Sequence, residues 1–241
     1  MLVAAAVCPA PPLLVPAVAA GAAAELGDAR TACSDALAVL AASRPDLLVV
    51  IGSADTPDAA GPYPQGSPGS FRGFGVAADV RLGEGDGDGD GGTPRPLPAP
   101  LAVGAWLLEH ARWGAAPLEG LAVAADLAPA QCLEAGRRLA AREERVALLV
   151  LGDGSACRTL KAPGYLDERA AAFDAAAGRA LAAADTAALA ALDPGLAREL
   201  QAAGRAPWQV LAGAAEGAGL DGRLLYEDAP YGVGYFVAAW S

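Results

Sequence analysis

Short, continuously apolar runs recur along this 241-residue chain, each bounded by turn-forming residues. A strand with one face in water alternates apolar and polar residues, so continuous runs predict strands that are covered on both faces. Helix-like stretches lie between the runs. This alternation predicts an α/β fold with a central, mostly parallel sheet and helices on both faces. The predicted strands are 2–7, 47–51, 76–80, 121–124 and 146–151.

The remaining segments complete a prediction of one domain that spans residues 1–241. Alanine is common in them, and alanine is the best intrinsic helix former. An aromatic segment, 231–240, is predicted to be a closing strand. Two stretches rich in proline and glycine, 56–72 and 83–100, are predicted to be flexible surface loops. The predicted helices are 29–42, 101–111, 129–142, 167–184, 186–192, 195–203 and 208–217.

The chain has a net charge of −11 and a single lysine, Lys161. Proteins that hold nucleic acid or anionic membranes by charge use clustered Lys and Arg, so we expect neither partner. No run reaches the roughly 18 apolar residues of a membrane helix, and no basic segment opens the chain as in a signal peptide. The cysteines are widely spaced, without a C-x-x-C pair, which predicts reduced, buried thiols rather than a zinc site. We therefore expect a cytoplasmic protein.

Polar residues follow two of the predicted strands, at the end of a parallel sheet where loops gather ligands. Asp153, Ser155 and Arg158 stand in the glycine-rich segment after the fifth predicted strand, and Asp55 follows the second. We expect the two aspartates to face the same edge of the sheet, although such residues also form ordinary turns and helix caps. His110 is the only histidine. A Ser-His-Asp triad could therefore use only His110, and a metal site held by several histidines is excluded.

Several segments resemble, in the same order, the signatures of one enzyme family. The family motif H-P-P-L is similar to Cys8-Pro-Ala10-Pro-Pro-Leu-Leu, the motif S-A-H to 48–55, and the motif D-H-G-x-W-V-P-L to Glu109 to Leu118. The motif G-S-G-S-x-x-H-N-L is similar to 148–160, and the motif A-F-D to 172–174. The chain thus resembles the catalytic subunit of the class III extradiol ring-cleavage dioxygenases, a group related to Memo-like proteins. His110 is the retained histidine of the third motif.

The resemblance implies an Fe(II) held by two histidines and one carboxylate, with positions left open for catecholate and oxygen. Here the family's ligand positions fall on Ala10, Asp55 and the region between Gly204 and Ala215, which contains no acid. The family's acid/base histidine falls on Arg158. One carboxylate cannot hold iron in that manner, so we expect no cofactor. Fe(II) in a rearranged ligand set is the alternative.

Three functions stay open. The first is a divergent family member that binds a small anionic or aromatic molecule in the former active-site cleft, lined by Asp55, His110, Asp153, Ser155 and Arg158. Arg158 would act there as an anion clamp, or as an internal ion-pair partner of Asp55 or Asp153. The second is a working ring-opening dioxygenase with a rearranged iron site that includes Asp55. The third is a non-catalytic interaction subunit, including self-association into a homo-oligomer.

Overall fold

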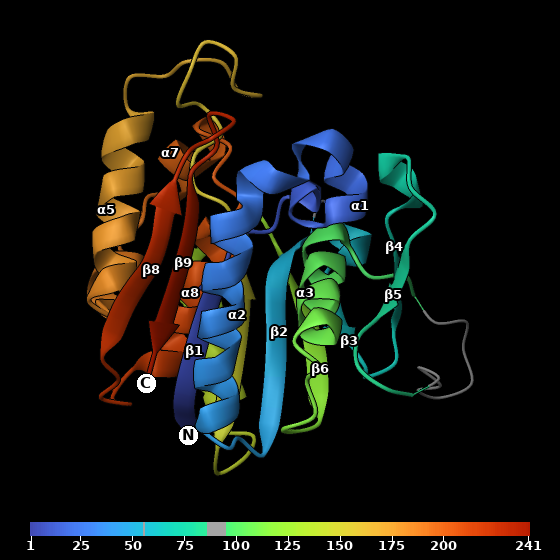
Figure 1. Ribbon diagram of the computed structural model, residues 1–241. Coiled ribbons are helices and arrows are strands. Elements are labelled where there is room, and N and C mark those ends of the chain that lie inside the picture. The colour runs from blue at the N-terminus through green and yellow to red at the C-terminus, as the bar shows by residue number, and fades with distance from the viewer. Residues whose placement is uncertain (55, 86–94) are drawn as a thin grey trace.

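Parallel strands form the centre of the molecule in the computed structural model, which describes residues 1–54, 56–85 and 95–241. The main sheet of these residues contains β1 (Leu2–Cys8), β2 (Leu47–Ala54), β3 (Gly61–Tyr63), β6 (Leu118–Ala124), β7 (Val146–Leu151), β8 (Gly222–Asp228) and β9 (Tyr235–Trp240). The strand order is β3-β6-β2-β7-β1-β9-β8 (Figure 1). β1, β2, β6 and β7 are mutually parallel, whereas β3, β8 and β9 add antiparallel pairs.

The continuous apolarity of the central strands matches their burial. Every residue of β2 and β7 is buried, and β7 lies between β1 and β2 with Leu148 in register with both Ala5 and Val49. Because successive side chains of a strand point to opposite faces, such strands need a cover on each side of the sheet. The predicted α/β fold with a mostly parallel sheet is confirmed.

Helices cover both faces of this sheet. On one face Ala4 and Ala6 of β1 pack with α2 and α3, which lie in front of the sheet in Figure 1. On the other face Ala5 and Val7 pack with α4, α5 and α8. No helix in the described ranges combines the length and the apolar content needed to cross a bilayer. The α-helices are α1 (Pro16–Ala19), α2 (Gly27–Ala42), α3 (Ala99–His110), α4 (Pro129–Ala140), α5 (Ala170–Ala182), α6 (Thr186–Ala190), α7 (Pro194–Glu199) and α8 (Arg205–Ala215).

Helices α4 and α8 pack unusually closely. A Cβ atom on Gly136 of α4 would collide with the Val210 carbonyl group, and one on Gly213 of α8 would collide with the Leu133 backbone. Glycine is therefore required at both positions for the two backbones to approach. This contact lies in the carboxyl-terminal half of α8 and holds the helix against α4, with Arg205 of the candidate site described below at the other end of α8.

The predictions differ from the structure at the short and edge strands, and the predicted strand 76–80 forms a strand only from Asp79 onward. The predicted loop 56–72 contains β3, which pairs with β6, and β4 (Pro68–Ser70), which pairs with β5 (Asp79–Arg81) in a separate sheet. These strands are short and at the sheet edge, where proline is tolerated, so they lack a sequence signal. The edge strand β8 was not predicted because it is only half-buried and carries several charges. In the predicted loop 83–100, residues 86–94 lie outside the described residues.

Candidate functional site at the carboxyl edge of the sheet

The carboxyl ends of β1, β2, β6 and β7 meet at one edge of the sheet because these strands are parallel. The chain leaves β1 and β2 toward the face of α2 and α3, whereas it leaves β6 and β7 toward the opposite face. Neighbouring strands in the order β6-β2-β7-β1 therefore send their connections to opposite sides. In open α/β sheets, ligands bind in the crevice that forms at such points.

Asp153 lies at this edge, as predicted. It follows β7, and its Oδ1 accepts a hydrogen bond of 2.8 Å from the backbone N–H of Ala10, which follows β1. Burial raises the pKa of the Asp153 carboxyl group to about 7, although the Ala10 hydrogen bond acts in the opposite direction. Burial and the nearby Asp153 also raise the pKa of the Tyr235 phenol. The carboxyl group can therefore exchange a proton near neutral pH.

Ser155 and Arg158 turn to the opposite face and contact a different acid. The fully buried Asp174 of α5 accepts hydrogen bonds from the Ser155 backbone N–H at 2.7 Å and the Ser155 hydroxyl group at 2.8 Å. Its Oδ2 also pairs with Arg158 Nη1 at 3.0 Å. Arg158 therefore forms an internal ion pair, but with Asp174, so the predicted pairing with Asp153 is wrong. Because Asp174 neutralises the positive charge of Arg158, that charge is not free to bind an anionic ligand.

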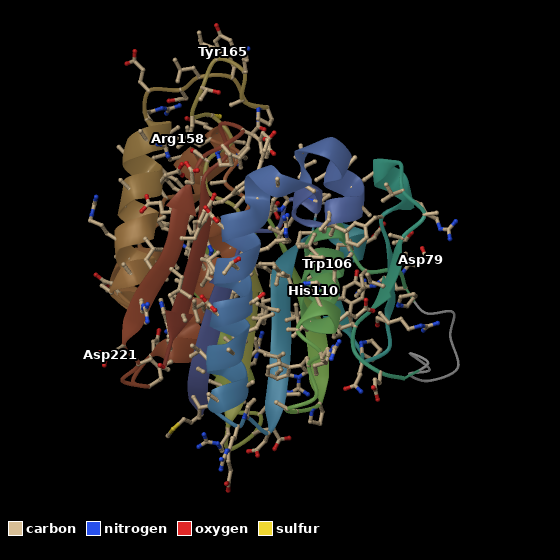
Figure 2. All side chains as sticks on the ribbon, viewed as in Figure 1. Asp79, Trp106, His110, Arg158, Tyr165 and Asp221 are labelled. Carbon is tan, nitrogen blue, oxygen red and sulfur yellow. The ribbon has the colours of Figure 1, made fainter. Side chains whose placement is uncertain are left out.

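His110 does not join these residues. The amino-terminal end of α3 lies beside the carboxyl end of β2, where Pro100 packs on Gly52. The helix then runs back along the sheet for roughly 18 Å to its last residue, His110. There the exposed imidazole ring stacks on Trp106, with 5.2 Å between the ring centres (Figure 2). The prediction that His110 lines one cleft with Asp153 is wrong, because it lies at the opposite end of the helix.

The positions that the family resemblance assigns to iron ligands do not fit a classical Fe(II) site. Ala10 lies at the carboxyl edge but offers only a methyl group, and Asp55 lies outside the described residues. The region from Gly204 to Ala215 is buried and forms α8, without an acid. Within residues 1–54, 56–85 and 95–241, no three His, Cys, Asp or Glu side chains come together as a metal site would require. We therefore assign no step to iron.

A cavity of about 380 Å³ opens at the same edge, on the α8 side. It lies between the turn after β6, helix α7 and the start of α8, and we call it the edge cavity. A larger hollow of about 570 Å³ lies beside β4 and β5, and its charged lining residues are an exposed Arg72–Asp79 ion pair together with Arg81 and Glu109. The edge cavity is lined by Ala125, Asp126, Pro194, Gly195, Ala197, Arg198, Gln201, Ala202, Ala203 and Arg205.

Arg205 forms one wall of the edge cavity and is only 2% exposed. Its Nη1 donates to the Leu127 carbonyl oxygen at 2.5 Å and to Gln209 Oε1 at 3.0 Å, and its Nη2 donates to the Ala125 carbonyl oxygen at 2.5 Å. The backbone N–H of Gly204 donates to the Asp153 carbonyl oxygen at 2.8 Å. The start of α8 is therefore tied to the ends of both β6 and β7.

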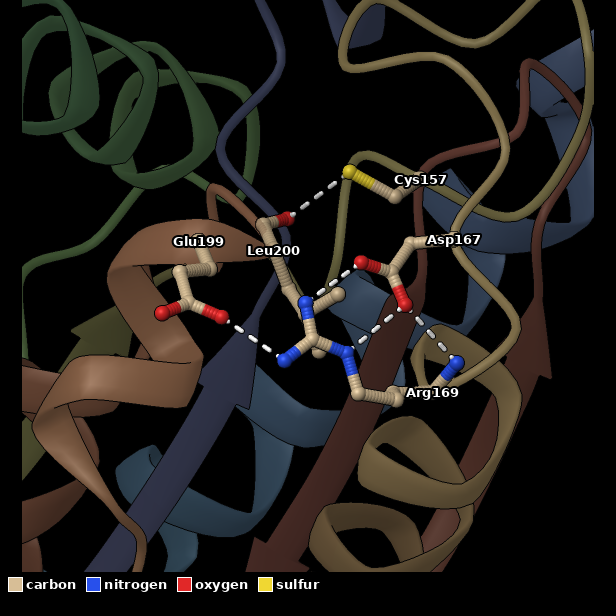
Figure 3. A network of polar contacts seen from close by, with 5 residues as sticks. All are labelled: Cys157, Asp167, Arg169, Glu199 and Leu200. Carbon is tan, nitrogen blue, oxygen red and sulfur yellow. Dashed lines mark hydrogen bonds and ion pairs between the residues drawn. The ribbon is translucent and has the colours of Figure 1, made fainter.

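Helix α7, the outer wall of the edge cavity, is fixed by a polar network (Figure 3). Arg169 pairs with Asp167 through two nitrogens and with Glu199 at 2.7 Å. Next to Glu199, the Leu200 carbonyl oxygen accepts hydrogen bonds from the Ala156 N–H at 2.8 Å and the Cys157 thiol at 3.5 Å. The loop after β7 thus holds the end of α7 in place.

Sequence reasoning missed the residues of this cavity. Asp126 follows β6 in the same way that Asp153 follows β7, so the rule applied to strand-end acids could have found it. Arg198 and Arg205 lie in helical segments without any motif. Only the packing of α7 and α8 against the carboxyl edge places them at a cavity.

Comparisons with known proteins support the fold and no more. No protein-family model matches the chain, and no curated protein matches it. Among solved structures, the uncharacterized protein JW3007 from Escherichia coli K12 is similar over 99% of both chains, with a TM-score of 0.52 and 15% sequence identity. This similarity supports the α/β fold.

Proposed function

We propose that this chain is a small-molecule-binding protein whose ligand occupies the edge cavity. One observation carries the proposal: a cavity of about 380 Å³ at the carboxyl edge of a parallel sheet, with a buried arginine in its wall. Small-molecule sites are usually cavities of about 300–1,000 Å³ with apolar walls and a few fixed polar groups. The alanine, proline and glycine walls of the edge cavity, together with Arg205, meet that description.

We propose further that the chain is a divergent relative of the class III extradiol dioxygenases without their ring-opening chemistry. The order of the motif-like segments along the whole chain supports this relation. The chemistry argues against the activity, because Ala10 cannot ligate a metal and Arg158 is neutralised by Asp174. A guanidinium group that stays charged cannot serve as an acid/base near neutral pH. Binding therefore accounts for the described residues better than catalysis does.

A cavity-filling variant tests this function. Ala203 is exposed and lines the edge cavity, so Ala203→Trp should fill the space without disturbing the core. Ala176→Trp places the same side chain on the exposed surface of α5 as a control. A small-molecule library is screened by thermal shift, and we expect compounds that stabilise the wild type and Ala176→Trp but not Ala203→Trp. Hits that act equally on all three proteins, or no hits at all, would contradict the proposal.

A further inference from the structure

The guanidinium group of Arg205 is buried, yet all its hydrogen-bond acceptors among the described residues are neutral. They are two backbone carbonyl oxygens, the side-chain oxygen of Gln209 and, at 3.9 Å, the Cys132 thiol, whose pKa is raised by burial. The Gln209 amide group is itself fixed, because its Nε2 donates to the carbonyl oxygens of Ala190 and Leu192. These contacts orient the guanidinium group but do not balance its charge.

A buried charge is costly unless an opposite charge lies nearby. Arg158 shows the usual solution in this chain, since it is half-buried and pairs with Asp174 at 3.0 Å. Arg205 is more deeply buried, and no ion pair joins it to any carboxylate in the described ranges. Its position in the wall of a cavity makes a bound anion the natural counter-charge.

The geometry of the guanidinium group supports an anion with two oxygens. Two Nη1–H groups and one Nη2–H group of Arg205 are used, whereas Nε–H has no acceptor among the described residues. Nε and Nη2 form the edge that binds carboxylates side-on. Arg72, Arg137 and Arg169 each hold a carboxylate through these two nitrogens elsewhere in the chain.

The surroundings of the edge cavity also favour an anion. Arg198 is exposed at its rim, and the amino-terminal end of α8, which has no side-chain cap, adds the positive end of a helix dipole. Asp126 is the single acid among the described lining residues, and it is exposed. The other walls are mostly small and aliphatic, and no aromatic ring lines the described cavity. A ligand with an aliphatic body suits these walls better than a flat ring that would need stacking.

We propose that the edge cavity binds an aliphatic monocarboxylate, whose carboxylate group pairs with Arg205 and whose chain lies against the alanine and proline walls. Arg198 contributes a second positive charge at the rim. This inference rests on the proposed function, since it names the ligand class of the same cavity. It also transfers the anion-binding role that the sequence suggested for Arg158 to Arg205.

One acid outside the described residues is the competing counter-charge. Asp55 directly follows Ala54, which is in register with Ala124, and the next residue, Ala125, accepts a hydrogen bond from Arg205. If Asp55 neutralised Arg205, removal of its charge by Asp55→Asn would be needed before an anion could bind. If a ligand fills that role, Asp55→Asn should leave anion binding within about twofold of the wild type.

The experiment compares hexanoate with hexanamide, which has the same chain but no charge, by calorimetric titration of the purified protein. We expect hexanoate to bind and hexanamide to bind at least about tenfold more weakly, as expected when a charge-assisted hydrogen bond is lost. Arg198→Gln should weaken hexanoate binding several-fold while leaving the fold intact, because Arg198 is exposed. Arg205→Lys keeps the charge but not the two-nitrogen fork, and should weaken binding further. Arg138→Gln, at an exposed position of α4, is the charge-matched control and should bind as the wild type does.

The outcomes separate this inference from the proposed function. If hexanoate and hexanamide bind equally and Ala203→Trp abolishes both, the edge cavity is a ligand site as proposed. The inference that its ligand is an anion is then overturned. Hexanoate binding that appears only in Asp55→Asn would show that Asp55 neutralises Arg205 in the wild type, and would overturn the proposal that the wild type binds an anion. Equal weakening by Arg138→Gln and Arg198→Gln would show an effect of net charge alone and would overturn anion binding at the edge cavity. If Arg205→Lys fails to fold, Arg198→Gln and hexanamide still decide the result.

Discussion

Substitution of Asp153 by asparagine should change how stability depends on pH. The carboxyl group has an ordinary pKa of 3.8 in the unfolded chain and a pKa of about 7 in the folded protein. Between these values the unfolded chain loses the proton while the folded protein keeps it, so rising pH stabilises the unfolded state. The stability contributed by the protonated group is complete below about pH 4 and is lost as the pH rises to about 7.

The size of the effect follows from the two pKa values, about 7 and 3.8. One pKa unit corresponds to about 1.4 kcal/mol, so the limit is about 4 kcal/mol. Asp153 is only partly buried, and water reduces the effect, so we expect wild-type stability to fall by about 2 kcal/mol between about pH 5 and pH 8. Asp153→Asn cannot ionise but can still accept the Ala10 hydrogen bond through its amide oxygen. The variant should therefore be more stable than the wild type at about pH 8, by a similar amount.

Urea unfolding followed by circular dichroism at several pH values measures this difference. Asp126→Asn removes the same charge from an exposed strand-end position and is the matched control. The reasoning is refuted if Asp153→Asn and the wild type keep parallel pH profiles, or if wild-type stability rises between about pH 5 and pH 8. A shift shared by Asp126→Asn would reflect net charge rather than the buried carboxyl group.

Three further predictions concern other parts of the chain. Asp174→Ala should lower the free energy of unfolding by about 3–4 kcal/mol, because it leaves the Ser155 N–H and hydroxyl groups unsatisfied and Arg158 unpaired. The control Asp185→Ala removes only the exposed cap of α6 and should lower it by about 1 kcal/mol. Equal losses of the two variants in urea unfolding would contradict this prediction. Ala184, just after α5, has a φ of 49°, in the left-handed region that favours glycine, so Ala184→Gly should stabilise the protein by about 0.5–1 kcal/mol. Ala176→Gly, within α5, should destabilise the protein by a similar amount. Calorimetric melting that shows the same sign for both variants would refute this argument. Elemental analysis of freshly purified protein should find far less than one iron per chain, and about one iron per chain that is lost in Asp55→Ala would revive the dioxygenase.

The sequence by itself determined the fold class because it encodes burial directly. The continuous apolar runs of β1, β2 and β7 are possible only for strands covered on both faces, and the alanine-rich segments between and after them are helical in the structure. Asp153 was also placed at the correct edge, because a residue that follows a parallel strand has little choice of position. The edge strands β3 and β8 escaped prediction, since half-exposed strands are paired through their backbones and need little apolar patterning.

The tertiary structure alone decided which polar residues meet. Asp153 and Ser155 are two residues apart, yet one reaches Ala10 and the other reaches Asp174 on the opposite face of the sheet. His110 was separated from both by the direction of α3, which the sequence pattern does not reveal. Arg205 was brought to the edge cavity by hydrogen bonds that tie the start of α8 to the residues after β6 and β7. Side-chain partners depend on distances between elements remote in sequence, and these distances are set by packing rather than by local pattern.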